Sequence, residues 1–349
     1  MKPIAITLGD PAGIGPEIIA KAFRDGGERM AGCFVAGDLE CLRRGAAAVQ
    51  QGQAGLPIAV IGSPAEALDV PPRCVALLQV VAAQALPPMA SVSAAAGRIA
   101  AECVTWAARA ALRGEIAALV TAPLHKEALA AAGVAFPGHT ELLQAEAAAF
   151  LGQSVADVPV RMMLANDELR TVLVSIHMAL RKAIEAVDFE NVLQTLRITD
   201  ASLSALLGHK PRIGVAGLNP HAGEGGLFGR EELDVIIPAL RAARAEGIDA
   251  HGPYAPDTVF MRARFTSGHP GEFDVVVAMY HDQGLIPVKY LGVDKGVNVT
   301  LGLPMVRTSP DHGTAFDIAG SGRANASSLL EAVRMARLLA GGAGLLRAA

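Results

Sequence analysis

Three stretches of the sequence share one pattern, in which a short apolar run ends abruptly in polar residues. They are 170–177 (RTVLVSIH), 212–221 (RIGVAGLNPH) and 273–284 (FDVVVAMYHDQG). Short runs that are rich in β-branched residues and lack polar alternation predict strands buried on both faces, as in a parallel sheet. Because open α/β sheets bind ligands at the carboxyl ends of their strands, we expect the polar residues that follow to share one edge.

Strand-like and helical patterns alternate along the rest of the chain, which predicts an α/β fold. Segments 293–300 and 301–325 have little periodicity and are expected to be loops. Asn166 and Asp167 predict a hairpin-like turn between two strands. The further expected strands are 3–8, 33–37, 57–62, 117–120 and 161–164. Helices are expected at 91–112, 188–207, 230–246 and 327–340, together with one that follows Lys126 and ends near Gly133 and one that follows the loop 136–141 and runs through Leu151.

A glycine-rich turn, GDPAGIG at 9–15, follows the first expected strand, and a helix is expected to begin at Pro16. A strand, a glycine-rich turn and a helix are typical of dinucleotide sites. However, Ile18 stands where the third glycine of the dinucleotide fingerprint should be. The sequence therefore does not predict a standard Rossmann site, and a simple tight turn is the alternative.

Composition narrows the class of protein. The chain has 349 residues, of which 52% are hydrophobic, and this is enough to form the core of two domains or of one elaborate α/β unit. Its net charge is −4. The chain has no excess of basic residues, so its charge does not indicate binding to a nucleic acid or to a membrane surface. The four cysteines form no CxxC pair, so we expect reduced core thiols. No signal peptide and no uninterrupted apolar stretch of about 18 residues is found, so we expect a cytoplasmic protein.

Each of the three opening stretches ends in a histidine or contains one: His177, His221 and His281. Three imidazoles with an open fourth position are the ligand set of a catalytic Zn²⁺ site. The alternative is three separate strand-end histidines that make ordinary hydrogen bonds.

Two groups of polar residues indicate anion binding. His139 and Thr140 precede an expected helix, where unpaired amides attract anions, although a simple cap formed by Thr140 explains them as well. A second group lies after the last expected strand, and its Arg is suited to a carboxylate or phosphate. Its members are Lys289, Lys295, Asn298 and Arg307. The loop 307–314 is too rich in donors for a simple linker, whereas Lys295 also fits a solvated surface.

Taken together, these motifs make the chain resemble the 4-hydroxythreonine-4-phosphate dehydrogenase family of pyridoxal phosphate biosynthesis. They are GDPAGIGPE (9–17), APLHKEAL (122–129), FPGHTE (136–141), GLNPHAGEGG (217–226), MYHDQGL (279–285), VNVTLGLP (297–304) and RTSPDHGTAFDIAG (307–320). The first and last also resemble loops of isopropylmalate and isocitrate dehydrogenases. This resemblance implies a two-domain α/β/α fold, isopropylmalate-dehydrogenase-like, with a non-Rossmann NAD site.

Roles follow from the resemblance, motif by motif. It implies divalent-metal ligands at His177, His221 and His281, with zinc, magnesium or cobalt as the metal. Implied substrate contacts are His139, Thr140, Lys289, Asn298 and Arg307. Implied NAD or NADP contacts are His312, Gly313 and Thr314. His221 and Lys126 are the catalytic candidates; Lys126 or a metal-bound water is the candidate base, and Asp257 has no assigned role.

The resemblance also implies a homodimer with its active site at the subunit interface, so that the metal ligands mix two chains. It implies a cofactor-side domain, 1–135 with 296–349, and a metal, substrate and dimerisation domain, 136–295. The implied reaction is oxidation of 4-phosphohydroxy-L-threonine followed by decarboxylation to 3-amino-2-oxopropyl phosphate. Relatives that oxidise 4-phosphothreonate, 4-phosphoerythronate or cis-dihydrodiol carboxylates share most of these motifs, so the substrate stays open. The His-Thr pair of FPGHTE favours a phosphorylated one.

Overall fold

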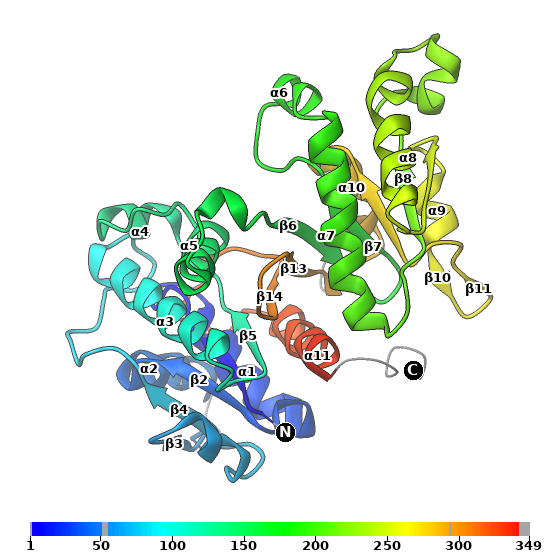
Figure 1. The fold of residues 1–349 in the computed structure, drawn as a ribbon. Coiled ribbons are helices and arrows are strands. Elements are labelled where there is room, and N and C mark those ends of the chain that lie inside the picture. The colour runs from blue at the N-terminus through cyan, green and yellow to red at the C-terminus, as the bar shows by residue number, and fades with distance from the viewer. Residues whose placement is uncertain (1, 51–54, 293–294, 342–349) are drawn as a thin grey trace. The chain divides into compact units, whose positions relative to one another are not determined.

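A computed structural model describes the chain from residue 2 to 341, apart from 51–54 and 293–294. The chain divides into two compact units. Unit 1 comprises Met1–Pro159 with Leu303–Ala340, and unit 2 contains Val160–Gly302. Each unit has a sheet covered by helices on both faces (Figure 1), which confirms the predicted α/β/α class.

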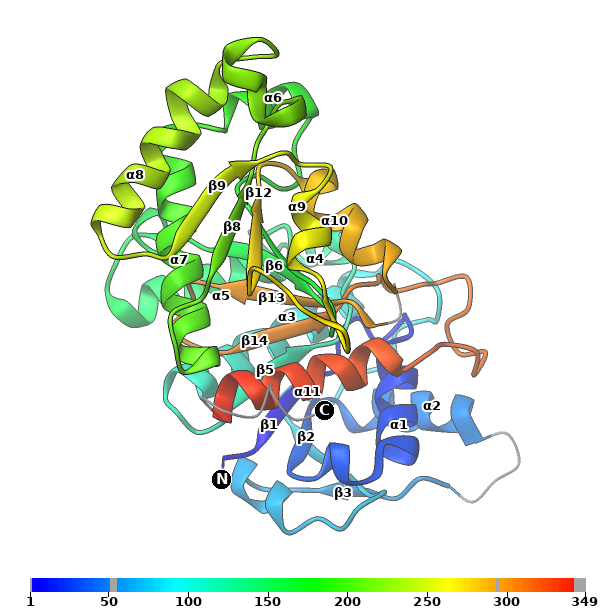
Figure 2. The same cartoon turned by 90° about the vertical axis from the view of Figure 1, so that its right-hand side faces the viewer.

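Unit 1 contains a fully parallel sheet with the strand order β3-β4-β2-β1-β5-β14. Helices α3, α4 and α5 lie on one face, and α1, α2 and α11 lie on the other (Figures 1 and 2). The strands are β1 (Ile4–Thr7), β2 (Cys33–Gly37), β3 (Ile58–Val60), β4 (Val75–Gln79), β5 (Ala118–Thr121) and β14 (Arg307–Pro310). The helices are α1 (Gly15–Gly26), α2 (Leu39–Gln50), α3 (Ala94–Leu112), α4 (Lys126–Ala131), α5 (His139–Leu151) and α11 (Ser327–Gly341), with short 3₁₀ turns η1 (Gly27–Met30), η2 (Pro64–Leu68) and η3 (Val155–Asp157).

The alanine-rich helix α3 explains how unit 1 packs so closely. Its first turn is capped by Ser93, whose side chain accepts a hydrogen bond from the Ala96 amide at 3.1 Å. A Cβ on Gly97 would lie 1.9 Å from the Ala128 carbonyl oxygen, so only glycine lets α4 approach here. Small residues thus set the separation between these two helices.

Unit 2 contains a mixed sheet with the order β13-β6-β7-β12-β8-β9. The β13/β6 and β6/β7 pairs are antiparallel, whereas β7, β12, β8 and β9 run parallel. The strands are β6 (Arg161–Ala165), β7 (Arg170–Leu173), β8 (Ile213–Ala216), β9 (Ala250–Tyr254), β12 (Val275–Ala278) and β13 (Val297–Leu301), with a small hairpin of β10 (Phe265–Thr266) and β11 (His269–Pro270). The helices are α6 (Leu180–Glu185), α7 (Phe189–Leu207), α8 (Ile237–Ala245), α9 (Val259–Ala263) and α10 (His281–Tyr290), with a 3₁₀ segment η4 (Pro220–Gly226) and a π-helical turn η5 (Glu232–Ile236).

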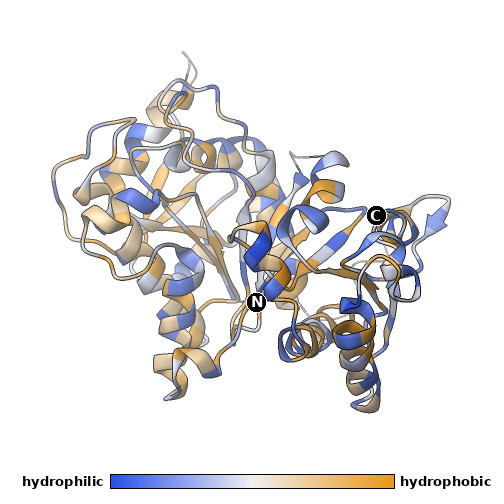
Figure 3. Ribbon diagram, turned by 90° about the horizontal axis from the view of Figure 1, so that it is seen from above, coloured by the Kyte–Doolittle hydropathy of each residue, from blue (hydrophilic) through white to orange (hydrophobic). Residues whose placement is uncertain are grey.

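The central strand β12 is buried along its whole length, as its uninterrupted apolar run predicts. Helices α7 and α8 cover one face of this sheet, and α9 and α10 cover the other (Figure 2). The hydropathy colouring concentrates hydrophobic residues along the strands and on the helix sides that face them (Figure 3). The parallel strands therefore form the buried layer from which the neighbouring loops extend.

Six strands of the described residues were not anticipated from the sequence: β4, β9, β10, β11, β13 and β14. The expected loops at 293–300 and 301–325 contain β13 and β14, although 293–294 lie outside the described residues, and β4 had no strand signal. Strand β14 reads RTSP, which is polar, yet it is buried because its polar groups find partners inside. For example, the Thr308 hydroxyl donates to the Ala332 carbonyl at 2.8 Å. A polar strand of this kind cannot be predicted from hydrophobic periodicity.

The expected domain division at 135/136 also differs from the compact units. Residues 136–159 lie with unit 1 because α5 packs on α3, where Arg109 and Glu146 form an ion pair. The second expected boundary, at 295/296, is close to the observed return into unit 1 at Leu303. Among the helices of the described residues, none combines the length and the apolar content needed to cross a membrane.

Candidate functional site

The carboxyl ends of three neighbouring parallel strands in unit 2 lead to the three predicted histidines. His177 follows β7, His281 follows β12 and His221 follows β8, and these strands are adjacent in the order β7-β12-β8. The three apolar runs therefore form neighbouring strands whose carboxyl ends share one edge of the unit 2 sheet.

Two of these histidines lie close together. The ring centroids of His177 and His281 are 5.5 Å apart. His281 begins helix α10, and its Nδ1 is 2.7 Å from a carboxylate oxygen of Asp282. Such a carboxylate fixes the orientation of an imidazole and leaves its Nε2 available to a ligand. This pair is suited to form part of a metal site.

His221 lies apart from that pair, on η4. Its ring contacts Phe228, with 6.0 Å between centroids, and its side chain is exposed. Within the described part of a single chain, no group of three or more His, Cys, Asp or Glu side chains is placed to hold a metal ion. One copy of unit 2 thus offers two neighbouring imidazoles, and the third predicted ligand lies on a separate loop.

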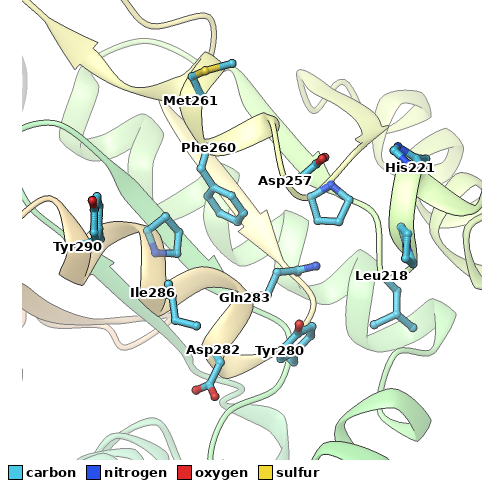
Figure 4. A pocket seen from close by; sticks show the side chains of 13 residues that line it. Leu218, His221, Asp257, Phe260, Met261, Tyr280, Asp282, Gln283, Ile286 and Tyr290 are labelled. Atoms are coloured by element: carbon cyan, nitrogen blue, oxygen red, sulfur yellow. The ribbon is translucent and has the colours of Figure 1, made fainter.

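An open pocket of about 760 Å³ lies in unit 2 beside His221 (Figure 4). Gln283 extends into it; its amide oxygen accepts a bond from the Met279 amide, and its amide nitrogen donates to the Gly217 carbonyl. Apolar side chains dominate the wall: Met261 is 68%, Ile286 63% and Tyr290 91% exposed. The unassigned Asp257 lies on the same rim. So much exposed apolar surface around one hollow is typical of a surface that another molecule covers.

The second cluster of predicted residues is buried in unit 1, at Arg307 on β14. The Arg307 side chain is 4% exposed, and its Nε and Nη2 donate to the Thr121 hydroxyl at 3.2 and 2.7 Å. Burial lowers the pKa of Arg307 to about 10, with a smaller opposing effect from Glu141. A guanidinium in such a place is still cationic at neutral pH, and it is far more attractive to an anion than one in water.

His139 lies beside this guanidinium. Burial lowers the pKa of His139 well below its usual value, and the positive charge of Arg307 lowers it further. Its Nε2 is buried and has no hydrogen-bond partner among the described residues. An orphaned buried nitrogen next to a buried cation indicates that a ligand atom completes the site. Thr140 does not cap α5, contrary to the alternative considered above, because the cap residue is Gly138.

Lys126 lies near the same loop of unit 1. It opens helix α4, and a Cβ on Gly138 would be 4.0 Å from its Cε and 3.3 Å from a carboxylate oxygen of Glu141. The remaining predicted substrate residues, Lys289 on α10 and Asn298 on β13, belong to unit 2. The amine of Lys126 is therefore within the neighbourhood of the His139 loop.

The predicted cofactor loop contacts the glycine-rich turn within unit 1. The Ile14 amide donates to the Thr314 carbonyl at 3.0 Å, and a Cβ on Gly13 would lie 2.8 Å from the same oxygen. The two loops follow β14 and β1, which flank β5 in the sheet. Nearby, burial raises the pKa of Asp10, and the Ala12 amide at 2.8 Å partly opposes this. Within the described part of the chain the buried Nε2 of His312 has no hydrogen-bond partner, whereas Gly313 is exposed.

Some residues of these clusters carry no motif that would reveal them. Thr121, Asp282 and Glu232 each bond a predicted site residue or the loop that bears it. Asp282 is adjacent to His281 in sequence, so a search for carboxylates beside a candidate ligand would find it. Thr121 and Glu232 reach their partners only through the fold, across 186 and 13 residues.

Comparisons with known proteins identify one family. Residues 29–336 match the family model described as pyridoxal phosphate biosynthetic protein PdxA. A 4-hydroxythreonine-4-phosphate dehydrogenase of Beijerinckia indica is 51% identical over 94% of this chain and 92% of its own length. A D-threonate 4-phosphate dehydrogenase of Salmonella typhimurium is 45% identical over 97% of this chain and 99% of its own. The crystal structure of a 4-hydroxythreonine-4-phosphate dehydrogenase from Klebsiella pneumoniae superposes with a TM-score of 0.86 at 41% identity, covering 97% and 100% of the two chains.

Proposed function

Because the chain belongs to the pyridoxal phosphate biosynthetic protein PdxA family, we propose that it is an NAD(P)-dependent dehydrogenase of a small phosphorylated hydroxy acid. The first candidate substrate is 4-phosphohydroxy-L-threonine, which such an enzyme oxidises and decarboxylates to 3-amino-2-oxopropyl phosphate on the route to pyridoxine 5′-phosphate. The observation that carries the proposal is the buried Arg307 guanidinium beside the unpaired Nε2 of His139.

The first task of the site is to hold the anionic substrate. Arg307 is pre-oriented by Thr121, so a phosphate or carboxylate binds it with little loss of side-chain freedom. His139 stays neutral near pH 7, which lets it share one hydrogen bond with the same anion. In the proposal Thr140, Lys289 and Asn298 contact the remaining polar groups of the substrate.

The second task is to activate the secondary hydroxyl. His177 and His281 are the proposed ligands from one chain, and His221 from a second copy completes the set. A divalent ion such as Zn²⁺, Mg²⁺ or Co²⁺, when bound there, supplies Lewis-acid polarisation of the hydroxyl and of the carbonyl formed from it. Asp282 keeps His281 in the tautomer that leaves Nε2 free.

The third task is proton transfer. Lys126 is the proposed base that accepts the hydroxyl proton, and NAD or NADP, when bound, would supply the hydride acceptor. The resulting β-keto acid loses CO₂, and the enolate is reprotonated on carbon. His312, Gly313 and Thr314, together with the turn after β1, are the proposed cofactor contacts.

A homodimer is part of the proposal, because a single described chain holds only two of the three histidines near each other. The exposed apolar residues supporting it lie in unit 2, around the pocket of Figure 4 and on the loop that bears His221, where Leu227 is 73% exposed. Dimers with two-fold symmetry exchange equivalent surfaces, so each copy can present His221 to the other.

A second candidate substrate is D-threonate 4-phosphate, which the Salmonella relative's name specifies. It shares the phosphate, the carboxylate and the secondary hydroxyl, and it lacks the amino group. The Arg307 cluster recognises the shared anionic groups, so it does not separate the two substrates.

NAD(P)H formation, followed by absorbance with each candidate substrate and each cofactor, tests the proposal. We expect turnover with one phosphorylated hydroxy acid, loss on chelation and recovery with added Zn²⁺, Mg²⁺ or Co²⁺. The dephosphorylated acid is the matched control and should be turned over poorly. Reduction of neither NAD nor NADP with any phosphorylated or cis-dihydrodiol substrate would contradict the proposal.

A further inference from the structure

The loop that bears His221 has an unusual backbone. From His221 to Gly225 all residues have positive φ, and three of them are not glycine: His221 at 52°, Ala222 at 51° and Glu224 at 43°. For an L-residue this conformation costs about 1–2 kcal/mol. Several such residues in succession persist only where the surroundings hold them in place, and this kind of strain is concentrated at functional sites.

The group that holds this loop is the carboxylate of Glu232. The Glu232 side chain belongs to the π-helical turn η5, and the residue is 1% exposed. Its Oε1 accepts hydrogen bonds from the amides of Leu218 and Asn219, both at 2.7 Å. Its Oε2 accepts a third bond from the Asn219 side chain at 3.0 Å. These bonds fix the two residues that precede Pro220 and His221.

The loop also closes around the carboxylate from the other side. A Cβ on Gly223 would lie 2.6 Å from Glu232 Oε2, so only glycine fits there, and its φ of +78° requires glycine as well. A Cβ on Gly217 would lie 3.1 Å from Oε1. Residues on both sides of His221 are therefore packed against one charged group.

Burying a carboxylate to stabilise a loop has a large desolvation free energy. Removing a charge from water costs several kcal/mol unless hydrogen bonds compensate for it, and a neutral residue of the same size avoids that cost. Amide-to-carboxylate bonds are shorter and roughly twice as strong as neutral ones. Their benefit is a backbone with one fixed conformation.

We propose that Glu232 is a positioning residue that holds the left-handed loop of η4 so that His221 can act as a metal ligand. This inference rests on the role of His221 in the proposed function. In this proposal Glu232 acts through its hydrogen bonds to Leu218 and Asn219 and its packing against Gly223. The π-helical turn places it there, as such turns often do at functional sites.

Glu231 provides a matched control. It precedes Glu232, carries the same carboxylate and bonds the same Asn219 side chain, at 2.6 Å. That bond lowers the pKa of Glu231, but the side chain is partly exposed and bonds no amide of residues 218–223. A Glu231→Gln variant removes the same negative charge and leaves in place the hydrogen bonds from the Leu218 and Asn219 amides to Glu232.

The test compares Glu232→Gln, Glu231→Gln, Gly223→Ala and His221→Ala in the full-length protein. Hydrogen exchange of the Leu218 and Asn219 amides is measured without metal, and Co²⁺ and Zn²⁺ affinities are measured by competition with a chelator. For Glu232→Gln we expect at least about tenfold faster exchange and a 10–100-fold loss of metal affinity, with an unchanged oligomeric mass. Glu231→Gln should stay within about twofold of the parent in both measurements. Gly223→Ala displaces the carboxylate from the opposite side and should weaken metal binding even if Glu232→Gln folds poorly.

The possible outcomes distinguish a failure of the Glu232 inference from a failure of the proposed function of His221. If His221→Ala weakens metal binding but Glu232→Gln binds metal like the parent, the inference is overturned and the proposed function stands. If Glu232→Gln is unfolded, parent-like metal affinity in Gly223→Ala has the same meaning. Unchanged amide exchange in folded Glu232→Gln also overturns it. If the parent binds no metal, or His221→Ala binds it normally, the assignment of His221 fails and the inference fails with it.

Discussion

The buried Arg307 cluster of unit 1 and the histidine edge of unit 2 are built in opposite ways. Arg307 is 4% exposed and bonds Thr121, and its charge lowers the pKa of His139, all within one compact unit. His177 and His221 are exposed, and within the described chain the histidines do not complete a metal site. The Arg307 cluster is therefore formed by the folding of a single chain. The histidine edge depends on something added afterwards, which we propose to be a second copy of the chain and a metal ion.

The largest expected effect comes from Arg307→Lys. The substitution keeps the charge and loses the paired donors, so KM for the phosphorylated substrate should rise by roughly 10–100-fold, equivalent to about 1.5–3 kcal/mol of charge-assisted bonding. Steady-state kinetics measure it. Arg161→Lys is the control, because Arg161 is a half-buried arginine that bonds Thr195 and other neutral groups of unit 2. A parent-like KM for Arg307→Lys would remove Arg307 from the anion site.

The next effect concerns the apolar surface of unit 2. Ile286→Asp places a charge at the pocket rim, where Ile286 is 63% exposed, and we expect association at least about tenfold weaker together with loss of activity. Val60→Asp is the matched control, since Val60 on β3 of unit 1 is 58% exposed. Sedimentation velocity across a dilution series reports both variants. Equal masses for Ile286→Asp and the parent at every concentration would show that this rim is not the interface.

A smaller effect is expected in the pH dependence of stability. The pKa of His139 is lower in the folded chain than in the unfolded one, so the unfolded chain binds the extra proton first. The contribution of His139 to stability is full above the unfolded pKa of about 6.5 and declines as the pH falls below it. His139→Asn should therefore lose less of its melting temperature than the parent between pH 7.5 and pH 5. Identical pH profiles for the two proteins would contradict a neutral His139 with its Nε2 shielded from water.

The smallest effect is the inertness of the thiols. Burial raises the pKa of Cys33 to about 11 and that of Cys41 to about 12, and it also raises the pKa of Cys103. The described chain contains free cysteines and no disulfide among them, as expected from their spacing. At pH 7.5 the thiolate fraction of these groups is well under about 1%, so iodoacetamide should leave native activity intact and label them only in urea. Rapid native labelling of Cys33, Cys41 or Cys103 would contradict their burial.

The same contrast explains what could be read from the sequence. Apolar runs predicted β7, β8 and β12, and with them the edge that bears the three histidines, because a strand buried on both faces has a simple pattern. The polar strand β14 gave no such signal, so Arg307 was expected in a loop. Its burial depends on partners such as Thr121, which lies 186 residues away. Glu232 was missed for the same reason, since its partners are backbone amides that any sequence would supply.

The central claim is that His221 serves the site of the neighbouring chain, whereas His177 and His281 serve their own. Mixed dimers of a His221→Ala chain and a His281→Ala chain, co-expressed with different tags and purified through both, test it most directly. We expect each homodimer to be inactive and the mixed dimer to recover about half of the parent's turnover, because one of its two sites keeps all three histidines. A mixed dimer as inactive as the two homodimers would contradict the claim.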